Sequence, residues 1–322
     1  MMDNDTLDML RTSLRHVLTE ATTLPLSDRL AELGWDEVVA DDPVTALHTL
    51  FTLKGDTVSP ADALGPRLAA ALADALGDPQ LATATIGLDS PFGPSTLAAD
   101  RSLTVDAVVF TPPAGNIVVV QVDGVHLAVV NGSTLTCTAL TTTDGELAQY
   151  RLSGIVPAAQ VQCIEGATAS IAWNAMVTHG RWLLACELVG IAQHVIASAA
   201  QYTGERIQYG KPIGTFQALQ HRIASAHVLV VGAARLAEFA GTSGDEWSAL
   251  VAKTVAGQAA ETACTQAQQC YGAIGFTWEH EFHHYLRRTY VLDRLLGDWR
   301  SLERQIGNEL MTSRHVPKIG ML

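Results

Sequence analysis

The chain has 322 residues, of which 16% are charged and 48% are apolar, and its formal net charge is −13. This much apolar material supports a large core, and so few charges exclude a disordered chain. An acidic chain without a basic run lacks the clustered lysines and arginines that phosphate contacts require. We therefore expect neither nucleic acid nor an anionic membrane surface as a partner.

The first residues are acidic and show no basic segment followed by an apolar one, so we expect no secretory signal. The most apolar segment, 182–200, is interrupted by Glu187, Gln193 and His194, which favours a buried helix over a membrane span. The cysteines have scattered spacings and no CxxC pair, which predicts reduced core residues of a cytoplasmic protein. They are Cys137, Cys163, Cys186, Cys264 and Cys270.

The periodicity of the apolar residues divides the chain into three segments. Leucines recur at helical spacing within residues 1–78, which predicts an N-terminal helical domain. Residues 79–164 contain short valine-rich runs at 105–110, 116–122 and 126–130, with turn residues at 112–115 and at Asp123-Gly124. These runs predict a small, trimmed middle β domain, either an antiparallel sheet or a partial barrel.

Residues 165–322 have helical periodicity again. The stretch 169–202 contains no proline, and apolar stripes at three- and four-residue spacing follow at 219–233 and 247–258. A last long helix is predicted from Trp278 to beyond Leu302. Four such helices with short connections predict a C-terminal four-helix bundle, so the expected fold class is α+β, mainly α.

The connection between the first two of these helices is the most informative segment. A glycine-punctuated loop follows Tyr202, with Arg206 at the end of one helix and Gln217 at the start of the next. An arginine in this place can hold a phosphate by charge-assisted hydrogen bonds, and the N–H groups of a helix start favour an anion. On composition alone, an ordinary turn with a surface arginine stays open as the alternative.

This segment resembles the signature loop of the acyl-CoA dehydrogenase family, roughly ER-x-x-F/Y-G-K/R-x-I/L-x-x-F/H-Q. The residues in register are Glu205, Arg206, Tyr209, Gly210, Lys211, Ile213, Phe216 and Gln217. The segment 269–276 is similar to the family's Q-x-x-G-G-x-G-F/Y turn, with Ala273 in place of the second glycine. The resemblance covers most of the chain and is specific from about residue 165 to 290. It implies an acyl-CoA dehydrogenase-like fold.

The resemblance implies FAD as the cofactor. In the family, the loop contacts the pyrophosphate and adenosine of a neighbouring subunit's FAD, and the glycine turn binds the same FAD. These roles pass to Arg206, Gln208, Phe216, Gln217, Gln269, Gly272 and Gly275. Arg181 matches a family position near the bound thioester, which implies a substrate-binding residue.

The chain departs from the family at its catalytic base, which is a glutamate in one of two positions. Leu296 stands at the first position and Gly180 at the second, so both usual bases are absent. Asp298 could act as a displaced base, or it could be a capping or solvated aspartate. The segment 84–93 is also a poor match to the family's strand and loop that face the flavin.

Some actinobacterial acyl-CoA dehydrogenases of steroid catabolism are α2β2 heteromers, in which a shorter subunit lacks the glutamate and completes the FAD sites of its partner. The chain resembles this shorter subunit. The resemblance then implies α,β-dehydrogenation of an acyl-CoA, with a steroid-derived acyl group as a candidate. It also implies a homologous catalytic subunit and an electron-transfer flavoprotein as partners. A homomeric enzyme with a displaced base, and a structural subunit that binds no flavin, stay open.

A competing motif lies at residues 280–284, which satisfy the H-E-x-x-H pattern of zinc peptidases. On a helix, His280 and His284 could share a metal, with Glu281 as the base and Glu303 as a third ligand. A zinc hydrolase would leave the loop at 206–217 unexplained. We therefore expect no metal site.

Overall fold

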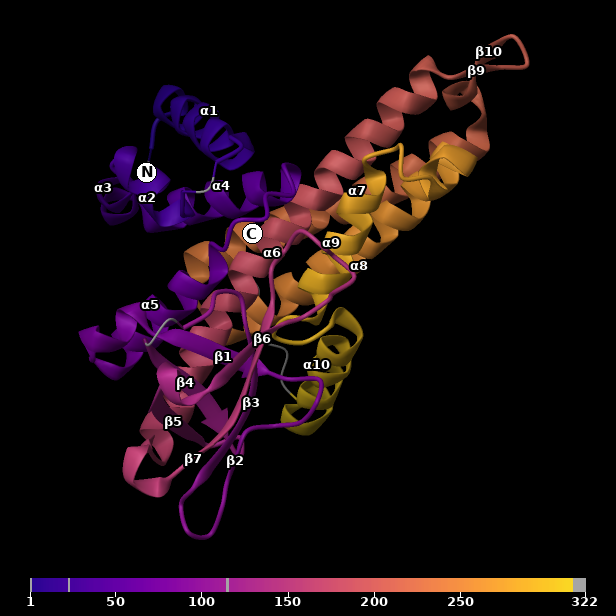
Figure 1. Ribbon diagram of the computed structural model, residues 1–322. Coiled ribbons are helices and arrows are strands. Elements are labelled where there is room, and N and C mark those ends of the chain that lie inside the picture. Colours follow the sequence, from indigo (N-terminus) through magenta and orange to yellow (C-terminus); the bar gives the residue numbers. More distant parts are fainter. Residues whose placement is uncertain (1, 23, 114–115, 315–322) are drawn as a thin grey trace. The chain divides into compact units, whose positions relative to one another are not determined.

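The computed structural model describes residues 2–22, 24–113 and 116–314. The chain forms two compact units, one of Met1–Ser59 with Arg181–Leu322 and one of Pro60–Gly180 (Figure 1). Helix α6 (Ala167–Glu205) contributes residues to both units. Most of the described residues lie in helices, which confirms the predicted α+β fold with mainly α content. The boundaries of the three expected domains stay a prediction.

The second unit contains the main sheet, whose strands run in the order β6-β7-β3-β1-β4-β5-β8 with β2 paired to β3. The strands are β1 (Thr85–Asp89), β2 (Thr96–Leu97), β3 (Leu103–Val109), β4 (Ile117–Val122), β5 (His126–Asn131), β6 (Thr136–Ala139), β7 (Tyr150–Val156) and β8 (Gln162–Ile164). Helix α5 (Leu64–Leu76) packs on β1 and so lies with the sheet rather than with the helices that precede it.

The sheet confirms the valine-rich strands and corrects their pairing. β1 pairs in parallel with β4, whereas an antiparallel sheet was one of the predicted forms. β1 lies between β3 and β4 and runs antiparallel to β3. β4 runs opposite to β3, so it points in the same direction as β1. The predicted turn at Asp123 and Gly124 joins β4 to β5, with φ of 53° and 72° at its two residues. Part of the other predicted turn, at 114–115, lies outside the described residues.

In the first unit, four short helices precede the long ones: α1 (Asn4–Thr19), α2 (Leu26–Glu32), α3 (Trp35–Asp41) and α4 (Pro43–Asp56). Asp3 caps α1 through the amide of Thr6, and Asp42 caps α4 through the amide of Thr45. Such side-chain acceptors satisfy amides that have no partner inside the helix. The apolar face of α4 is buried at Leu47, Leu50 and Phe51.

Three long helices form the bundle: α6, α7 (Gln217–Ser243) and α8 (Glu246–Tyr271). α8 contacts α7 and the two helices that follow it, and its many alanines and one glycine are buried on several sides. The predicted stripe on α7 is confirmed, since Ala226, Val230 and Ala233 are buried. Small residues on these faces let the helices pack closely.

The predicted long helix from Trp278 to beyond Leu302 is wrong, because two helices occupy this part: α9 (Phe282–Arg294) and α10 (Trp299–Ser313). Between them, Leu296 and Gly297 have φ of 56° and 104°, which no α-helix contains. Only glycine fits at 297, because a Cβ there would lie 2.5 Å from Leu302 Cδ2. The fourth position of the bundle is therefore filled by two helices with a tight loop.

α4 and α6 cross with their backbones in contact. A Cβ at Gly55 would lie 1.9 Å from the Glu187 carbonyl oxygen, and one at Gly190 would lie 2.0 Å from that of Thr52. Next to this crossing, Lys54 Nζ donates to Glu187 Oε1 at 2.6 Å, and both side chains are buried. The pair therefore joins the N-terminal helices to the bundle.

Arg288 of α9 extends this buried charge cluster. Its Nη1 lies 3.9 Å from Glu187 Oε1 and donates to the Ser59 carbonyl at 2.8 Å. One carboxylate thus faces two cations in a region that water does not reach. Buried ions of this kind are tolerated only when they are paired and hydrogen-bonded.

Two helices, α6 and α7, are long and apolar enough to cross a membrane by length and composition alone. In the most apolar window of α6, 72% of the residues are buried inside the protein, against 28% in α7. For α6, this burial agrees with the predicted core helix around Glu187. The expectation that no membrane is a partner stays a prediction.

All five cysteines are free, but only Cys186, Cys264 and Cys270 are buried. Cys137 is exposed and Cys163 is half-buried, so the expectation that all five lie in the core is wrong. The reason is their place in the sheet: β6 and β8 are its two edge strands, where one side has no neighbouring strand.

Replacing Glu187 by Gln removes the carboxylate that Lys54 and Arg288 share while keeping the side-chain volume. We expect the free energy of unfolding, measured by urea denaturation, to fall by about 3–5 kcal/mol, the usual cost of breaking a buried ion pair. Glu238→Gln is the matched control, because Glu238 pairs with Arg235 on the surface. There the change should stay within about 0.5 kcal/mol. Equal losses in both variants would contradict the importance of the buried pair.

Candidate functional site

The predicted glycine loop is a small hairpin. Helix α6 ends at Glu205, and β9 (Ile207–Gln208) pairs with β10 (Lys211–Pro212). Tyr209 and Gly210 form the turn with φ of 55° and 77°, the left-handed pair that two-residue hairpins require. Figure 1 shows this hairpin beyond the ends of α6 and α7. The sequence signal for this hairpin is Tyr209-Gly210 between two short segments. It is weak because each strand has only two residues.

The loop residues matched to FAD contacts are open to solvent. Arg206, Gln208 and Gln217 are exposed, and the guanidinium of Arg206 has no ion pair or side-chain hydrogen bond with another described residue. Gln217 is the first residue of α7, as predicted, and no side chain caps this helix start. Its first N–H groups therefore stay open to an anion. Phe216 lies under Lys211, whose Nζ is 4.4 Å from the centre of its ring.

The glycine turn follows the end of α8 and continues as the single-turn 3₁₀ helix η5 (Gly272–Phe276). Gly272 has φ of 63°, and a Cβ built there would meet no atom within 4 Å. Its backbone can therefore approach a ligand closely. Gly275 differs, because it is buried and a Cβ there would lie 3.0 Å from the Cβ of Tyr271. Gln269 is exposed on the last turn of α8.

The loop and the turn meet at the C-terminal end of α6. Tyr271, next to Gly272, donates its hydroxyl to Ser198 Oγ at 3.0 Å. Its ring meets that of Tyr202 edge-on, with 5.3 Å between their centres. Tyr202 is four residues before Arg206, so α6 positions both segments. These anchoring residues were missed in the sequence, where nothing distinguishes Tyr202 or Ser198 from other helical residues.

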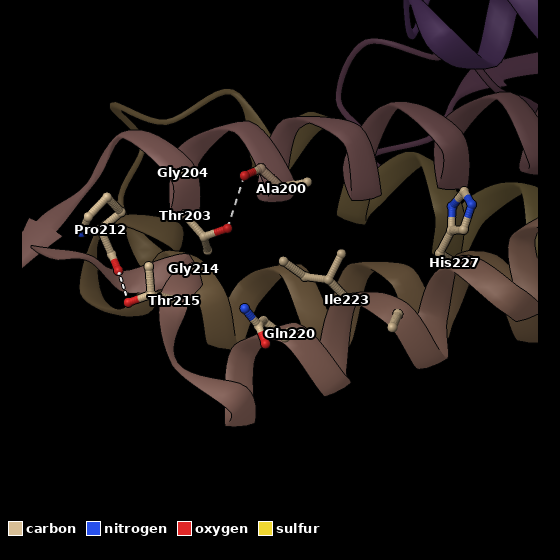
Figure 2. A pocket seen from close by; sticks show the side chains of 10 residues that line it. Ala200, Thr203, Gly204, Pro212, Gly214, Thr215, Gln220, Ile223 and His227 are labelled. Atoms are coloured by element: carbon tan, nitrogen blue, oxygen red, sulfur yellow. Dashed lines mark hydrogen bonds between the residues drawn. The ribbon is translucent and has the colours of Figure 1, made fainter.

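A cavity of about 460 Å³ lies directly behind the hairpin, between α6 and α7. Its lining residues are Ala200, Thr203, Gly204, Pro212, Gly214, Thr215, Gln220, Ile223, Ala224 and His227. Figure 2 shows Gln220, Ile223 and His227 reaching from α7 toward α6. The hydroxyls of Thr203 and Thr215 donate to the carbonyls of Ala200 and Pro212 at 3.0 and 2.7 Å. The wall is therefore largely apolar, with an imidazole and one amide as its remaining polar side chains.

The residue matched to substrate binding, Arg181, lies far from the hairpin along α6. Its Nε donates to the carbonyl of Leu296 at 3.0 Å, across 115 residues of sequence. Burial lowers the pKa of Arg181 from its usual value. Arg181 therefore contacts the loop between α9 and α10, which carries the first of the two positions where the family has its glutamate. Gly180, the second position, is the residue before Arg181.

A second cation, Lys253 of α8, holds the same loop from within the core. Its Nζ donates to the carbonyls of Asp293 at 3.0 Å and Gly297 at 3.2 Å. Burial lowers the pKa of Lys253 to about 8. Gly257 makes room for this arrangement, since a Cβ there would lie 2.3 Å from Asp293 Oδ1. Three carbonyls of the 293–297 segment are thus bound by two cations.

Asp298 has a structural task in this loop. Its Oδ1 accepts from the amide of Ser301 at 3.1 Å and caps α10. Partial burial raises its pKa, but the hydrogen bonds from Ser301 outweigh that effect and leave the pKa of Asp298 below its usual value. A lowered pKa makes a carboxylate a weaker proton acceptor. Its role as a displaced base stays a prediction, while the capping role is observed.

The poor match at 84–93 has a structural counterpart. After β1, Ser90 and Gly93 form an isolated bridge, and the guanidinium of Arg151 lies 4.3 Å from the centre of the Phe92 ring. The same arginine pairs with Asp106, with Nε at 3.1 Å from Oδ1. These contacts tie the segment to the face of β3 and β7.

The H-E-x-x-H motif is not on one helix, so that prediction is wrong. α9 begins at Phe282, after His280 and Glu281. The Nδ1 of His280 accepts from the Phe282 amide at 3.1 Å, and His283 Nδ1 donates to the His280 carbonyl at 2.7 Å. Within residues 2–22, 24–113 and 116–314, no group of three or more histidine, cysteine, aspartate or glutamate side chains is placed to hold a metal ion.

The buried lysine gives the stability a defined pH dependence. Between pH 8 and the ordinary lysine value of 10.5, the unfolded chain binds more protons than the folded one at Lys253, so this group's contribution to stability rises with pH. We expect Lys253→Met to remove that rise in urea denaturation between pH 7 and 10. Lys211→Met, at an exposed lysine, should keep the wild-type pH profile. Parallel profiles for wild type and Lys253→Met would refute the assignment.

Comparison with known proteins identifies the helical part. Residues 170–311 match the family model of the acyl-CoA dehydrogenase C-terminal domain. Acyl-CoA dehydrogenase IpdE2 of Mycobacterium tuberculosis is 34% identical over 131 residues, which are 41% of this chain and 41% of the relative. Acyl-CoA dehydrogenase FadE34 of the same organism is 39% identical over 124 residues, 36% of this chain and 17% of the relative. The match therefore spans less than half of either curated relative.

Solved structures resemble the whole chain. A variant of the Tcur3481–Tcur3483 steroid ACAD has a TM-score of 0.78 and 20% identity, covering 96% of this chain and 99% of that one. The ChsE4–ChsE5 complex from Mycobacterium tuberculosis has a TM-score of 0.74 and 18% identity, covering 99% of each chain. Residues 170–311 thus match the acyl-CoA dehydrogenase C-terminal domain, and the chain has the fold of an acyl-CoA dehydrogenase.

Proposed function

We propose that this chain is a subunit of an FAD-dependent acyl-CoA dehydrogenase that completes the FAD sites together with a homologous catalytic partner, as an α2β2 heteromer. The overall reaction is α,β-dehydrogenation of an acyl-CoA. Electrons pass to an electron-transfer flavoprotein, and the cytoplasmic location expected from the sequence belongs to the same proposal.

One observation carries the proposal: the chain keeps an exposed nucleotide-binding set but lacks the base. Arg206 and Gln208 lie on an open hairpin with their side chains exposed. At the two positions where the family has its glutamate, the chain has Leu296 and Gly180. A subunit that contributes to a neighbour's cofactor needs the first set, and its partner supplies the base.

The residues present fit the diphosphate and adenosine parts of FAD. Arg206 can bind a phosphate with two parallel hydrogen bonds, since its guanidinium is not engaged by another described side chain. The start of α7 at Gln217 adds unpaired N–H groups, and the open backbone at Gly272 allows close approach. FAD, when bound, supplies the hydride acceptor, and these residues hold and orient it.

Support for the substrate class comes from the relatives. Among the structural neighbours are a steroid ACAD and the ChsE4–ChsE5 complex. We extend to this chain a steroid-derived acyl group and a heteromeric assembly. Arg181, which is bound at one edge to the loop of Leu296, is the residue we assign to substrate binding.

The cofactor assignment predicts a loss of flavin in Arg206→Ala combined with Gln269→Ala. Each change removes one exposed side chain that would hold the nucleotide, so we expect the flavin content of the co-purified complex to fall at least about tenfold, as for loss of a charge-assisted bond. The measurement is flavin absorbance per chain. Arg235→Ala with Gln305→Ala is the control, because Arg235 is exposed on α7 and Gln305 on α10, and both lie outside the 206–217 loop and the 269–276 turn. Unchanged flavin in the first variant would exclude these residues from the site.

The assignment of the base to the partner predicts that Asp298→Asn leaves turnover nearly unchanged. Asparagine caps a helix about as well as aspartate, so α10 keeps its start, while a carboxylate base would be lost. The readout is turnover of the complex together with its flavin content. Abolished turnover with FAD still bound would favour a homomeric enzyme with Asp298 as its base.

A further inference from the structure

Tyr271 lies at the point where the two candidate FAD segments meet. It is the last residue of α8 and only 4% exposed. Its ring packs against His280 and Phe282, with centres 4.3 and 5.4 Å away, and against the edge of Tyr202. The Tyr271 hydroxyl donates to Ser198 of α6. Residues of α6 and of the segment after the glycine turn therefore hold the side chain of Tyr271 through four contacts.

Both segments depend directly on the residues in this cluster. The glycine turn begins at the next residue, Gly272, and it folds back so that a Cβ at Gly275 would lie 3.0 Å from the Cβ of Tyr271. On the other side, the carbonyl of Tyr202 accepts the amide of Arg206 at 2.9 Å. Ser198 and Tyr202 are four residues apart, on one face of α6.

The hairpin is held to the same end of α6 by further bonds. The Ile213 amide donates to the Arg206 carbonyl at 2.8 Å, which closes the hairpin on the end of the helix. A Cβ at Gly214 would lie 3.0 Å from the Thr203 carbonyl oxygen, so this glycine allows the returning chain to pack on α6. The position of Arg206 is thus set by the last turn of α6, which Tyr271 contacts.

We propose that Tyr271, held by the Ser198 hydroxyl and by the edge of Tyr202, is a positioning residue that makes the 206–217 loop and the 269–276 turn order as one unit. Burial raises the pKa of the Tyr271 hydroxyl, which keeps it protonated and able to donate. The gain is preorganisation: both halves of the nucleotide site are placed before the ligand arrives. The coupling rests on contacts within the chain, and its use for FAD rests on the proposed function.

Hydrogen–deuterium exchange of the full chain tests the coupling without any cofactor. Tyr271→Phe keeps the ring and removes the bond to Ser198, so we expect exchange to accelerate about 3- to 10-fold in both segments, 206–217 and 269–276. Ser198→Ala should reproduce this, and the double variant should add little to either single change. Acceleration confined to 269–276 would overturn the proposal.

Tyr285→Phe is the matched control. Tyr285 is also buried, and its hydroxyl donates to the Asp56 carbonyl at 3.0 Å, so the same single hydrogen bond is lost in the same bundle. Its ring stacks on His194. Exchange in the two segments should stay at the wild-type rate in Tyr285→Phe. Acceleration equal to that of Tyr271→Phe would mean that losing any buried hydrogen bond loosens the bundle, which would contradict a specific role of Tyr271.

A second readout separates this inference from the proposed function. In the complex co-purified with the catalytic partner, Tyr271→Phe should speed FAD release about 3- to 10-fold with an unchanged flavin spectrum, whereas Tyr285→Phe should not. Unchanged release, with wild type retaining FAD, would overturn the positioning role. If wild type holds no FAD while exchange shows the coupling, the proposed function fails and the coupling stands.

Discussion

The helical unit depends on the crossing of α4 and α6, where two glycines bring the backbones into contact beside a buried ion pair. Gly55 and Gly190 leave no space for side chains there, so Lys54 and Glu187 meet at 2.6 Å out of reach of water. Desolvation makes such a pair costly unless its geometry is held, and the glycine contact holds it. The same carboxylate faces Arg288, which extends the constraint to α9.

With α6 fixed in this way, its C-terminal end can serve as the anchor for the candidate nucleotide site. The hairpin grows out of its last turn, and Tyr271 brings the glycine turn to the same place through Ser198. The side chains of the candidate site, Arg206, Gln208, Gln217 and Gln269, stay exposed. Rigid support with open contact groups is the arrangement expected where a neighbouring subunit completes a site, because the groups must be placed without being satisfied internally.

The α9–α10 loop is held by two cations. Arg181 and Lys253 bind successive carbonyls, and Leu296 has the left-handed backbone that a bulky residue rarely adopts. Backbone strain of this kind persists only where surrounding contacts impose it. The loop is therefore a built element of the fold, with Leu296 at the position that the resemblance matches to the family's glutamate.

Local signals in the sequence determined much of this protein. Periodicity predicted the long helices and the valine-rich strands, because it depends on neighbours along the chain. The resemblance of the 206–217 loop and the 269–276 turn to a known family pointed to Arg206, Gln217 and Gly272 as candidate cofactor-binding residues. Other features needed the tertiary structure: the break at Leu296, the parallel pairing of β1 with β4, and the meeting of Tyr202 with Tyr271. Each of these depends on residues far apart in sequence, whose contacts no local pattern encodes. The sequence predicted one helix from Trp278 to beyond Leu302. In the structure, Gly297 packs against Leu302, and Arg181 and Lys253 bind the carbonyls of Leu296 and Gly297, where the helix is broken.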